Sequence, residues 1–278
     1  MPARERLSWY AERFDAVELN SSFYAVPDRT VVHKWVEETP ERFTFDVKVH
    51  RALSRHAAPL DSLPEDMRDG VETTARGRLR LSPELETALA KRLVEETAPL
   101  AEAGKLGAYL LQVTPAFGPG GHDLEELDRV VEAFGPHRVA VELRHRGWVR
   151  EKRRERTLGW FSERGVAFVC VDAPPGDEIP IMPSDLDAVT RDDLAYLRLH
   201  GRNSEGYLRG RSVAERFAWR YEDGELEEIA GRARAMAEQA AEVHVAFNNN
   251  RGDDAPTAAQ RFRALLGQAP AGEEQLRL

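Results

Sequence analysis

The sequence predicts an α/β protein of the TIM-barrel, or (β/α)8, class. Short apolar segments alternate with helical segments along the chain, and seven apolar segments are visible. The length of 278 residues suits a barrel, whose usual size is about 250 residues. Strands that alternate with helices pair in parallel, and strands this apolar fit a sheet covered by helices. An open, doubly wound sheet of seven strands is the alternative that the same pattern allows.

Seven segments have the composition of strands, because they are rich in Val, Leu and Phe and often adjoin Gly, Asn or Asp. They cover residues 15–20, 43–49, 107–113, 138–144, 166–172, 195–201 and 243–249. A barrel has eight strands and each helix follows a strand, whereas this sequence opens with the helical segment 6–14. We therefore expect the first strand to be missing upstream of Met1, by loss or by a misplaced start. The strand at 15–20 would then lie at an open edge.

The helical segments have recognisable ends. Asp28 can cap a first long helix, and Ser82 can cap a second one, after which Gly104 stands where a C′ glycine belongs. Asp123 and Glu126 have the spacing of a capping box. Two further helices, marked by periodic apolar residues, precede and follow the last strand.

We expect a single domain at residues 1–268. The connection at 50–82 is far longer than a usual βα loop, so it is either a functional lid or a mobile insertion. Residues 269–278 have the composition of a flexible tail.

Composition limits the classes of function. A net charge of −9 and a pI of about 5.5 disfavour extended binding to nucleic acid or to an anionic membrane, while leaving room for a local basic pocket. No apolar run is long enough to span a bilayer, and the first residues lack the apolar core of a signal peptide. Cys170 is the single cysteine, which excludes an internal disulfide and predicts a cytoplasmic protein. The oligomeric state cannot be inferred from these features.

Polar residues follow one face of six predicted strands. Side chains alternate along a strand, so residues two apart share a face. The residues concerned are Glu18, Asn20, Asp46, Lys48, Gln112, Glu142, Arg144, Arg198, His200 and Asn248, each near the carboxyl end of its strand. In a barrel this end forms the active-site rim. Burying so many charges only for structure is costly, so the pattern predicts a pocket, with Phe23 and Tyr24 as its wall.

Each of these residues also has an ordinary structural explanation. Glu142 and Arg144 could form part of an ion network, His200 could be a hydrogen-bonded core histidine, and Lys48 could extend to water. Gln112 and Asn248 could cap turns. The joint pattern favours a pocket, because six strands carry such groups at the same depth.

Six segments in this order resemble the signature sequences of the YecE-like family, the domain of unknown function 72: "VELNSSFYAVP", "FTFDVKVHR", "LLQVTPAF", "VELRHRGW", "LRLHGRNSEGY" and "FNNNRGDDAP". The resemblance extends from about residue 7 to about residue 266. It implies a TIM barrel, and it implies no established activity. The family's recurring pocket positions fall on Glu18, Asn20, Tyr24, Lys48, Gln112, Glu142, Arg144, Trp148, Arg198, His200 and Asn248.

The sequence departs from the family pattern at three places. The usual opening strand, with its Gly- and Trp-containing segment, is absent. Ser54 replaces a common Thr before the loop residue His56, and Ala258 replaces a common Asn. The missing opening has the largest consequence, since it would remove one strand and one loop from the pocket.

The residue types favour an enzyme that binds a small anionic substrate and uses no metal or cofactor. Arg144 and Arg198 would bind a phosphate or carboxylate through paired hydrogen bonds. Glu142 or His200 would act as general acid or base, and Lys48 would stabilise developing negative charge. The other predicted substrate contacts are Glu18, Asn20, Tyr24, Gln112, Trp148 and Asn248.

A second hypothesis is metal-dependent phosphoester hydrolysis or sugar isomerisation, as on the barrels of apurinic endonucleases and xylose isomerases. Its metal ligands would come from Glu18, Glu142, Asp172, His200 and Asn248. Local metal motifs such as H-x-x-E-H are absent, and nearby cations would repel a divalent ion.

A third hypothesis is a noncatalytic module that binds a nucleotide or the end of an RNA. Tyr24 and Trp148 would stack on its bases. The acidic composition disfavours extended contact with nucleic acid, but it is compatible with a single nucleotide.

Overall fold

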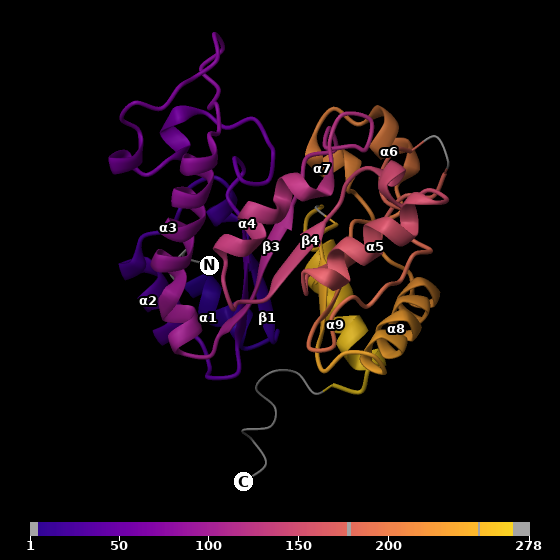
Figure 1. Ribbon diagram of the computed structural model, residues 1–278. Helices are drawn as coiled ribbons and strands as arrows, with labels where there is room; N and C mark the ends of the chain where they lie inside the picture. The colour runs from indigo at the N-terminus through magenta and orange to yellow at the C-terminus, as the bar shows by residue number, and fades with distance from the viewer. Residues whose placement is uncertain (1–4, 177–178, 250, 269–278) are drawn as a thin grey trace. The chain divides into compact units, whose positions relative to one another are not determined.

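The computed structural model describes residues 5–176, 179–249 and 251–268 (Figure 1). Seven strands form in these ranges: β1 (Ala16–Leu19), β2 (Thr44–Lys48), β3 (Leu106–Gln112), β4 (Val139–Glu142), β5 (Ala167–Asp172), β6 (Ala195–Leu199) and β7 (Val243–Phe247). Each coincides with one predicted segment. The predicted tail at 269–278 lies outside the described residues.

The fold class predicted from the sequence is confirmed. The strands follow one another in chain order, from β1 to β7, and the paired neighbours are parallel. A doubly wound sheet reverses its strand order near the middle, so this order identifies the TIM-barrel class instead. The described residues contain seven parallel strands, one fewer than the eight of a complete barrel.

Helices separate the strands, and their lengths vary widely. The described helices are α1 (Arg6–Ala11), α2 (Arg29–Glu37), α3 (Pro83–Glu102), α4 (Asp128–Ala133), α5 (Arg153–Glu163), α6 (Ser204–Arg209), α7 (Val213–Arg216), α8 (Asp223–Ala237) and α9 (Asp254–Leu265). Within the described part of the chain, none combines the length and the apolar character that crossing a membrane requires.

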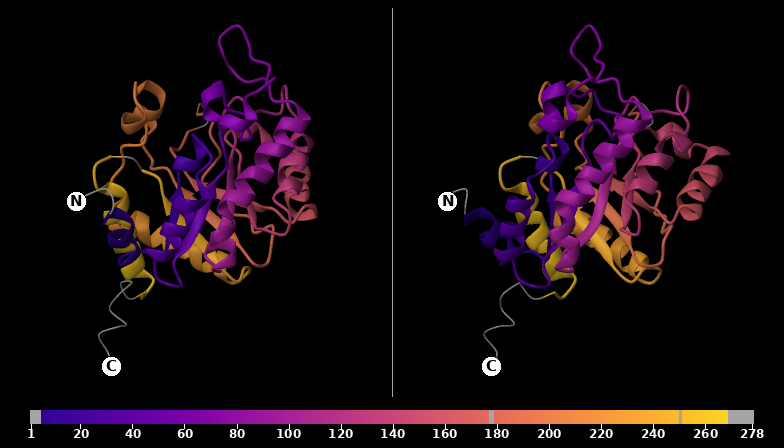
Figure 2. Two further views of the ribbon diagram at one scale, coloured as in Figure 1. Left: turned by 90° about the vertical axis from the view of Figure 1, so that its left-hand side faces the viewer. Right: turned by 60° about the vertical axis from the view of Figure 1, so that its left-hand side comes forward.

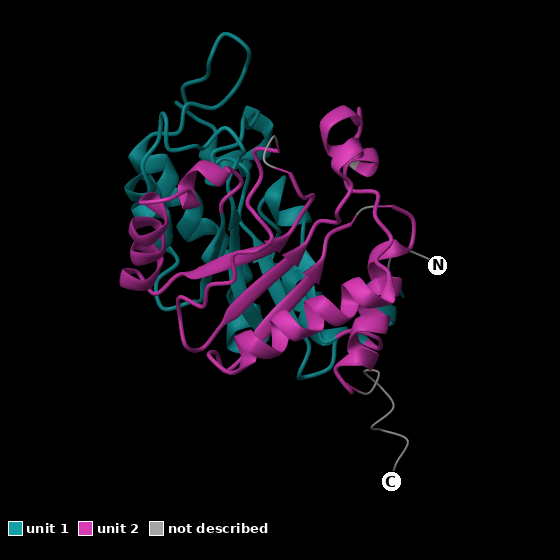
Figure 3. Ribbon diagram, turned by 90° about the vertical axis from the view of Figure 1, so that its right-hand side faces the viewer, with its two compact units in different colours: residues 1–11, 15–142 teal, residues 12–14, 143–278 magenta. Residues whose placement is uncertain are grey.

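The chain divides into two compact units (Figure 3). Unit 1 comprises residues 1–11 and 15–142, and unit 2 comprises residues 12–14 and 143–278. Unit 1 holds β1 to β4 and unit 2 holds β5 to β7. The single domain that the sequence predicts at 1–268 stays a prediction.

Helices cover one face of the strands in unit 1. The ring of Trp35 on α2 stacks on Phe45 of β2 with 6.4 Å between centroids. Tyr109 of β3 stacks on Phe134, which ends α4, at 4.4 Å, and its hydroxyl lies 2.7 Å from Thr97 Oγ1 on α3. Phe45 and Tyr109 alternate with the polar strand residues, so the polar residues point to the opposite face.

The strand register in unit 1 aligns the predicted polar residues. Glu18 of β1 pairs with Asp46 of β2, and Gln112 of β3 pairs with Glu142 of β4. Residues paired across parallel strands point to the same face. The helix-free face of unit 1 is therefore the one that carries the polar side chains, as the alternation predicted.

Unit 2 has the same arrangement. Phe168 of β5 packs edge-on against Phe161 of α5 at 5.1 Å, and Phe247 of β7 packs against Phe262 of α9 at 5.6 Å. These contacts identify the helix-covered face. Arg198 of β6 pairs with Val171 and so points to the other face.

The predicted helix caps form. Asp28 accepts a hydrogen bond from the backbone N–H of Thr30 at 2.7 Å at the start of α2, and Ser82 Oγ accepts one from Leu85 N at 3.2 Å at the start of α3. Asp123 forms the predicted capping box before α4. The sequence signals for these helix starts were therefore correct.

The connection at 50–82 has an ordered path, with two 3₁₀ turns, η3 (Leu60–Ser62) and η4 (Glu65–Met67). Its first part packs inward, because Leu53 and Leu63 are buried. Its distal part, near residues 70–80, extends beyond the helices and strands of unit 1 (Figure 2).

Candidate functional site

Two pairs of predicted site residues meet in unit 1. Lys48 Nζ donates a hydrogen bond to Asn20 Oδ1 at 3.3 Å, which joins the carboxyl ends of β1 and β2. Gln112 Nε2 donates to Glu142 Oε1 at 3.1 Å, which joins the carboxyl ends of β3 and β4. Glu142 is fully buried and Gln112 nearly so, and hence the hydrogen bond orients a carboxylate inside the protein.

Glu18 lies in β1, two residues before Asn20, and is half-buried. The pKa of Tyr10 is raised to about 12, mainly because Tyr10 is buried and also because the negative charge of Glu18 is nearby. The phenol of Tyr10 therefore stays neutral at physiological pH.

An aromatic corner forms at the carboxyl ends of β1 and β2; we use this name for Phe23, Tyr24, Lys48 and Arg51. Tyr24 meets Phe23 edge to face at 5.1 Å, and its side chain is 61% exposed. Lys48 Nζ lies 4.9 Å from the centre of the Phe23 ring. The Arg51 guanidinium carbon lies 5.8 Å from the centre of Phe23 and 5.9 Å from that of Tyr24. These separations are in the range of cation–π interactions.

Ser22 holds the corner in place. This buried residue lies in the 3₁₀ turn η2 (Ser21–Phe23), and its Oγ lies within hydrogen-bond distance of two backbone oxygens, Leu19 O at 2.6 Å and Lys48 O at 2.7 Å. Arg51 N donates to Phe23 O at 2.9 Å. The turn after β1 is thereby attached to the end of β2, which places the rings beside the two cations.

A third pair of predicted residues meets in unit 2. Asn248 Nδ2 and His200 Nδ1 lie 3.1 Å apart, beyond the ends of β7 and β6. Because the amide nitrogen is a donor, Nδ1 accepts, and the proton of the neutral imidazole lies on Nε2. Arg198, two residues before His200, shares its face of the strand, and both are fully buried.

Arg144 and Trp148 lie after β4, in the part of the chain that belongs to unit 2. Arg144 is half-buried. Trp148 belongs to the turn η6 (Arg146–Val149) and is 5% exposed, and its backbone oxygen accepts a hydrogen bond from Thr157 Oγ1 at 2.6 Å. The Trp148 ring is thus packed in the protein, unlike that of Tyr24.

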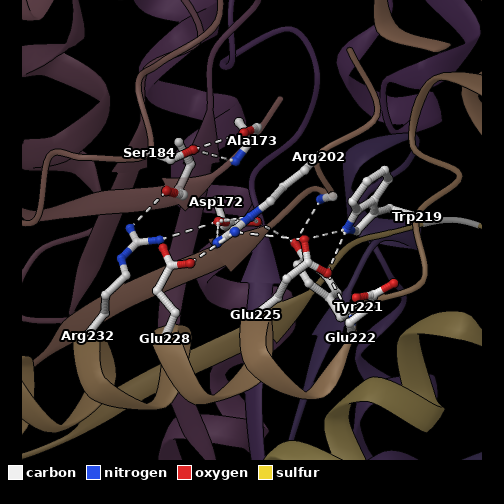
Figure 4. Close-up of polar contacts among 12 residues, drawn as sticks. Asp172, Ala173, Ser184, Arg202, Trp219, Tyr221, Glu222, Glu225, Glu228 and Arg232 are labelled. Atoms are coloured by element: carbon white, nitrogen blue, oxygen red, sulfur yellow. Dashed lines mark hydrogen bonds and ion pairs between the residues drawn. The ribbon is translucent and has the colours of Figure 1, made fainter. Parts of the chain in front are cut away.

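Asp172, named as a possible metal ligand in the second hypothesis, does not share a face with the polar residues of the other strands. It shares its face of β5 with Phe168, which packs on α5, so its carboxylate points to the helix-covered face. There it accepts hydrogen bonds from Arg202 at 2.8 Å and from the Tyr221 hydroxyl at 2.7 Å, and it lies 3.6 Å from Arg232 of α8 (Figure 4). Its carboxylate is fully buried and serves a structural ion network.

The Asp172 network positions the segment that follows β6. The Tyr221 hydroxyl accepts a hydrogen bond from Gly201 N at 2.9 Å, and the backbone oxygen of Asp172 accepts one from His200 N at 2.7 Å. Gly201 has a φ of +83°, and a Cβ there would lie 2.5 Å from Trp219 Cβ. Glycine is therefore required directly after His200.

Unit 1 also contains a cavity of about 750 Å³ that the sequence did not reveal. It is lined by Ala52, Arg55, His56, Leu81, Pro83, Glu86, His122, Glu125, Glu126, Asp128, Arg129 and Glu132. Glu86 pairs there with Arg55 and with Arg129, the latter at 2.9 Å. Five acids against two arginines in this lining disfavour an anionic ligand, so the predicted anion site does not lie in this cavity.

Arg51 was not predicted as a site residue. It stands three residues after Lys48, beyond the predicted strand, so the alternation of side chains does not apply to it. The sequence signal that could have indicated Arg51 was an aromatic residue, Tyr24, after one predicted strand and two cations, Lys48 and Arg51, at the end of the next. The prediction that all eleven named residues line one pocket stays a prediction, and so does the metal hypothesis. No cluster of three or more metal-ligating side chains occurs in the described ranges.

A parallel α/β fold of the TIM-barrel class, with polar side chains at the carboxyl ends of its strands, is the class that these observations define. The chain belongs to the DUF72 family, described as a protein of unknown function, whose sequence profile matches residues 1–277. The resemblance inferred from the sequence segments is therefore confirmed.

Two bacterial relatives carry the family name UPF0759. The chain is 29% identical over 271 residues to UPF0759 protein YunF of Bacillus subtilis (strain 168), an alignment that covers 95% of this chain and 87% of YunF. It is 30% identical over 171 residues to UPF0759 protein YecE of Escherichia coli (strain K12), covering 61% of this chain and 53% of YecE.

Solved structures of family members have the same fold. A DUF72 family protein (EF0366) from Enterococcus faecalis V583 superposes with a TM-score of 0.77 at 27% identity, covering 95% of this chain and 94% of that one. A DUF72 family protein (TM1631) from Thermotoga maritima MSB8 superposes with a TM-score of 0.75 at 25% identity, covering 96% and 91%.

Proposed function

We propose that this protein is an enzyme that binds a small substrate bearing a phosphate or a carboxylate and transforms it by acid–base chemistry without a metal. The observation that carries the proposal is a buried cation beside an oriented imidazole in unit 2. Arg198 and His200 are both fully buried on the helix-free face at the end of β6, and Asn248 fixes the tautomer of His200.

Arg198 is the proposed anion-binding residue, together with Arg144. A guanidinium can donate two parallel hydrogen bonds to the oxygens of a phosphate or carboxylate. In a buried setting the low local dielectric strengthens this attraction. The carboxyl ends of parallel strands are also where barrel enzymes bind their substrates.

The proposed acid–base roles follow from hydrogen bonds inside each unit. Asn248 orients the His200 ring through Nδ1, and we propose His200 as the general acid that protonates the substrate or stabilises a developing oxyanion. Glu142, oriented by Gln112, is the proposed base. Lys48 is proposed to stabilise negative charge. The remaining predicted substrate contacts, Glu18, Asn20, Tyr24, Trp148 and Asn248, keep that role as part of the proposal.

Thermal unfolding in the presence of inorganic phosphate or ribose 5-phosphate tests the proposal, with potassium chloride at equal ionic strength as the reference. At ten times its Kd, a bound anion should raise the Tm by about 2 °C. The shift should persist in EDTA, because no metal takes part. The Arg198→Lys variant keeps the charge but loses the paired donors, and should show less than half of the shift.

Arg220→Lys is the matched control, because Arg220 is exposed in the same unit. It should respond to phosphate like the wild type. If phosphate fails to stabilise the wild type, or stabilises Arg198→Lys equally, the anion-binding role of Arg198 is wrong. Stabilisation that disappears in EDTA would favour the metal-dependent hypothesis instead.

A further inference from the structure

Tyr24 presents its ring to solvent beside two cations, which is an unusual combination for a residue that only packs. It is 61% exposed, and its ring meets Phe23 edge to face at 5.1 Å. A flat, exposed aromatic ring can stack on a planar ligand, and every nucleobase has a face that can do so.

Arg51 supplies an anion-binding group next to this ring. Its guanidinium contacts Phe23 and Tyr24 through cation–π interactions at 5.8 and 5.9 Å. Among the described residues its Nε has no hydrogen-bond partner, although the atom is buried. In a chain of net charge −9, a guanidinium held by rings instead of a carboxylate keeps its donors for an incoming anion.

Lys48 adds a second positive charge beside Phe23. Its ammonium lies 4.9 Å from the centre of that ring and is directed by Asn20 Oδ1 at 3.3 Å. The corner therefore presents an aromatic face and two cations within one small region of unit 1.

The corner is preorganised by the backbone. Ser22 joins the turn after β1 to the end of β2, and Arg51 N donates to Phe23 O at 2.9 Å. A site whose groups are already in place loses less conformational entropy when a ligand binds.

We propose that the aromatic corner binds a free mononucleotide, whose base stacks on Tyr24 and whose phosphate is bound by Arg51 with Lys48. This inference goes beyond the proposed function, because it assigns a nucleotide phosphate to Arg51 and Lys48 in addition to the anion proposed at Arg198. A plain phosphate or sugar phosphate would use the cations and leave the exposed ring without a role.

Calorimetric titration with AMP, adenosine and ribose 5-phosphate separates the contributions of base and phosphate. AMP should bind more tightly than either fragment. Tyr24→Leu should weaken the binding of AMP about 10-fold, because one base–aromatic stack is lost. The affinity for ribose 5-phosphate should stay unchanged. Tyr24→Phe retains the ring and should stay within about 2-fold of the wild type. Because Tyr24 is exposed, its replacement should leave the far-UV circular dichroism unchanged.

Arg51→Gln should weaken the binding of AMP and of ribose 5-phosphate by similar factors of about 10, because each phosphate loses a charge-assisted hydrogen bond. The matched control is Arg76→Gln, which removes the same charge from an exposed residue of the 50–82 connection and should have no effect.

The outcomes distinguish this inference from the proposed function. If ribose 5-phosphate binds as tightly as AMP and Tyr24→Leu alters neither, the nucleotide assignment is overturned while the anion proposal survives. If none of the phosphate-bearing ligands binds, both fail. Tighter binding of a 5′-phosphorylated oligoribonucleotide than of AMP would overturn the assignment to a free nucleotide, since the RNA end would then be the ligand.

Discussion

Single side chains in this protein obtain their orientation from a neighbour on the next strand. Gln112 orients Glu142, Asn20 directs Lys48, and Asn248 selects the tautomer of His200. In each pair an uncharged amide holds a titratable group. An amide carries both a donor and an acceptor, so it can orient a base such as Glu142 or a cation such as Lys48.

His50 gives a residue-scale prediction about pH. It is buried directly after β2; its Nε2 lies 3.1 Å from Ser62 O and its Nδ1 accepts from Ala52 N at 3.3 Å, as a neutral ring requires. Burial lowers the pKa of His50 to about 4. The unfolded chain, with a His pKa of about 6.5, binds the proton more readily, so stability is lost as the pH falls from about 6.5 to about 4.

Urea unfolding of the wild type and of His50→Asn between pH 7 and pH 4 measures this effect. The variant lacks the titrating ring, so the difference in unfolding free energy between the two proteins should shrink by up to about 3 kcal/mol as the pH falls. Parallel pH profiles for the two proteins would show that His50 titrates normally.

Elements of unit 1 are joined by charged and polar groups as well as by apolar packing. Helices α2 and α3 lie side by side (Figure 1). Lys105, between α3 and β3, is 5% exposed, and its Nζ donates at 2.7 Å to the backbone oxygens of Val36 and Thr39 at the end of α2. The last carbonyls of a helix have no partner within it, and a cation there is favourable.

Replacement of Lys105 by Met should therefore lower the free energy of unfolding by about 2 kcal/mol, because buried carbonyl groups lose a charged donor. Urea denaturation measures the change. Lys91→Met, on the exposed side of α3, is the matched control and should change stability by less than about 0.5 kcal/mol. Equal stability of the two variants would mean that water replaces the ammonium at the end of α2.

At the scale of the whole molecule, the chain has two compact units, whereas the sequence predicts one domain at 1–268. A single domain should unfold in one transition that all probes share. Tryptophans report on each unit: Trp35 lies in unit 1, and Trp160 and Trp219 lie in unit 2.

Variants that retain tryptophan only in unit 1 or only in unit 2 should show the same urea midpoint if the single-domain prediction is correct. Fluorescence gives the local transition and far-UV circular dichroism gives the global one. Two separate midpoints, each following one set of tryptophans, would show that the units unfold independently.

Most of the fold could be predicted because it is specified locally. Apolar runs, Asp28 as a cap and the capping box of Asp123 act through residues a few positions apart, so the sequence alone reveals them. The site was predictable only in part. Asp172 looked like the other strand-end acids, and only the packing of Phe168, on the same face of β5, against α5 shows which face Asp172 occupies.

By itself, the sequence determined the alternation of strands and helices, the TIM-barrel class and the family, since periodicity and short motifs are properties of neighbouring residues. Tertiary structure alone decided the path of the 50–82 connection, the neighbours of Asp172 and the approach of Arg51 to Tyr24. These depend on how turns bring distant residues together, and the free energy of such contacts is absent from any local pattern.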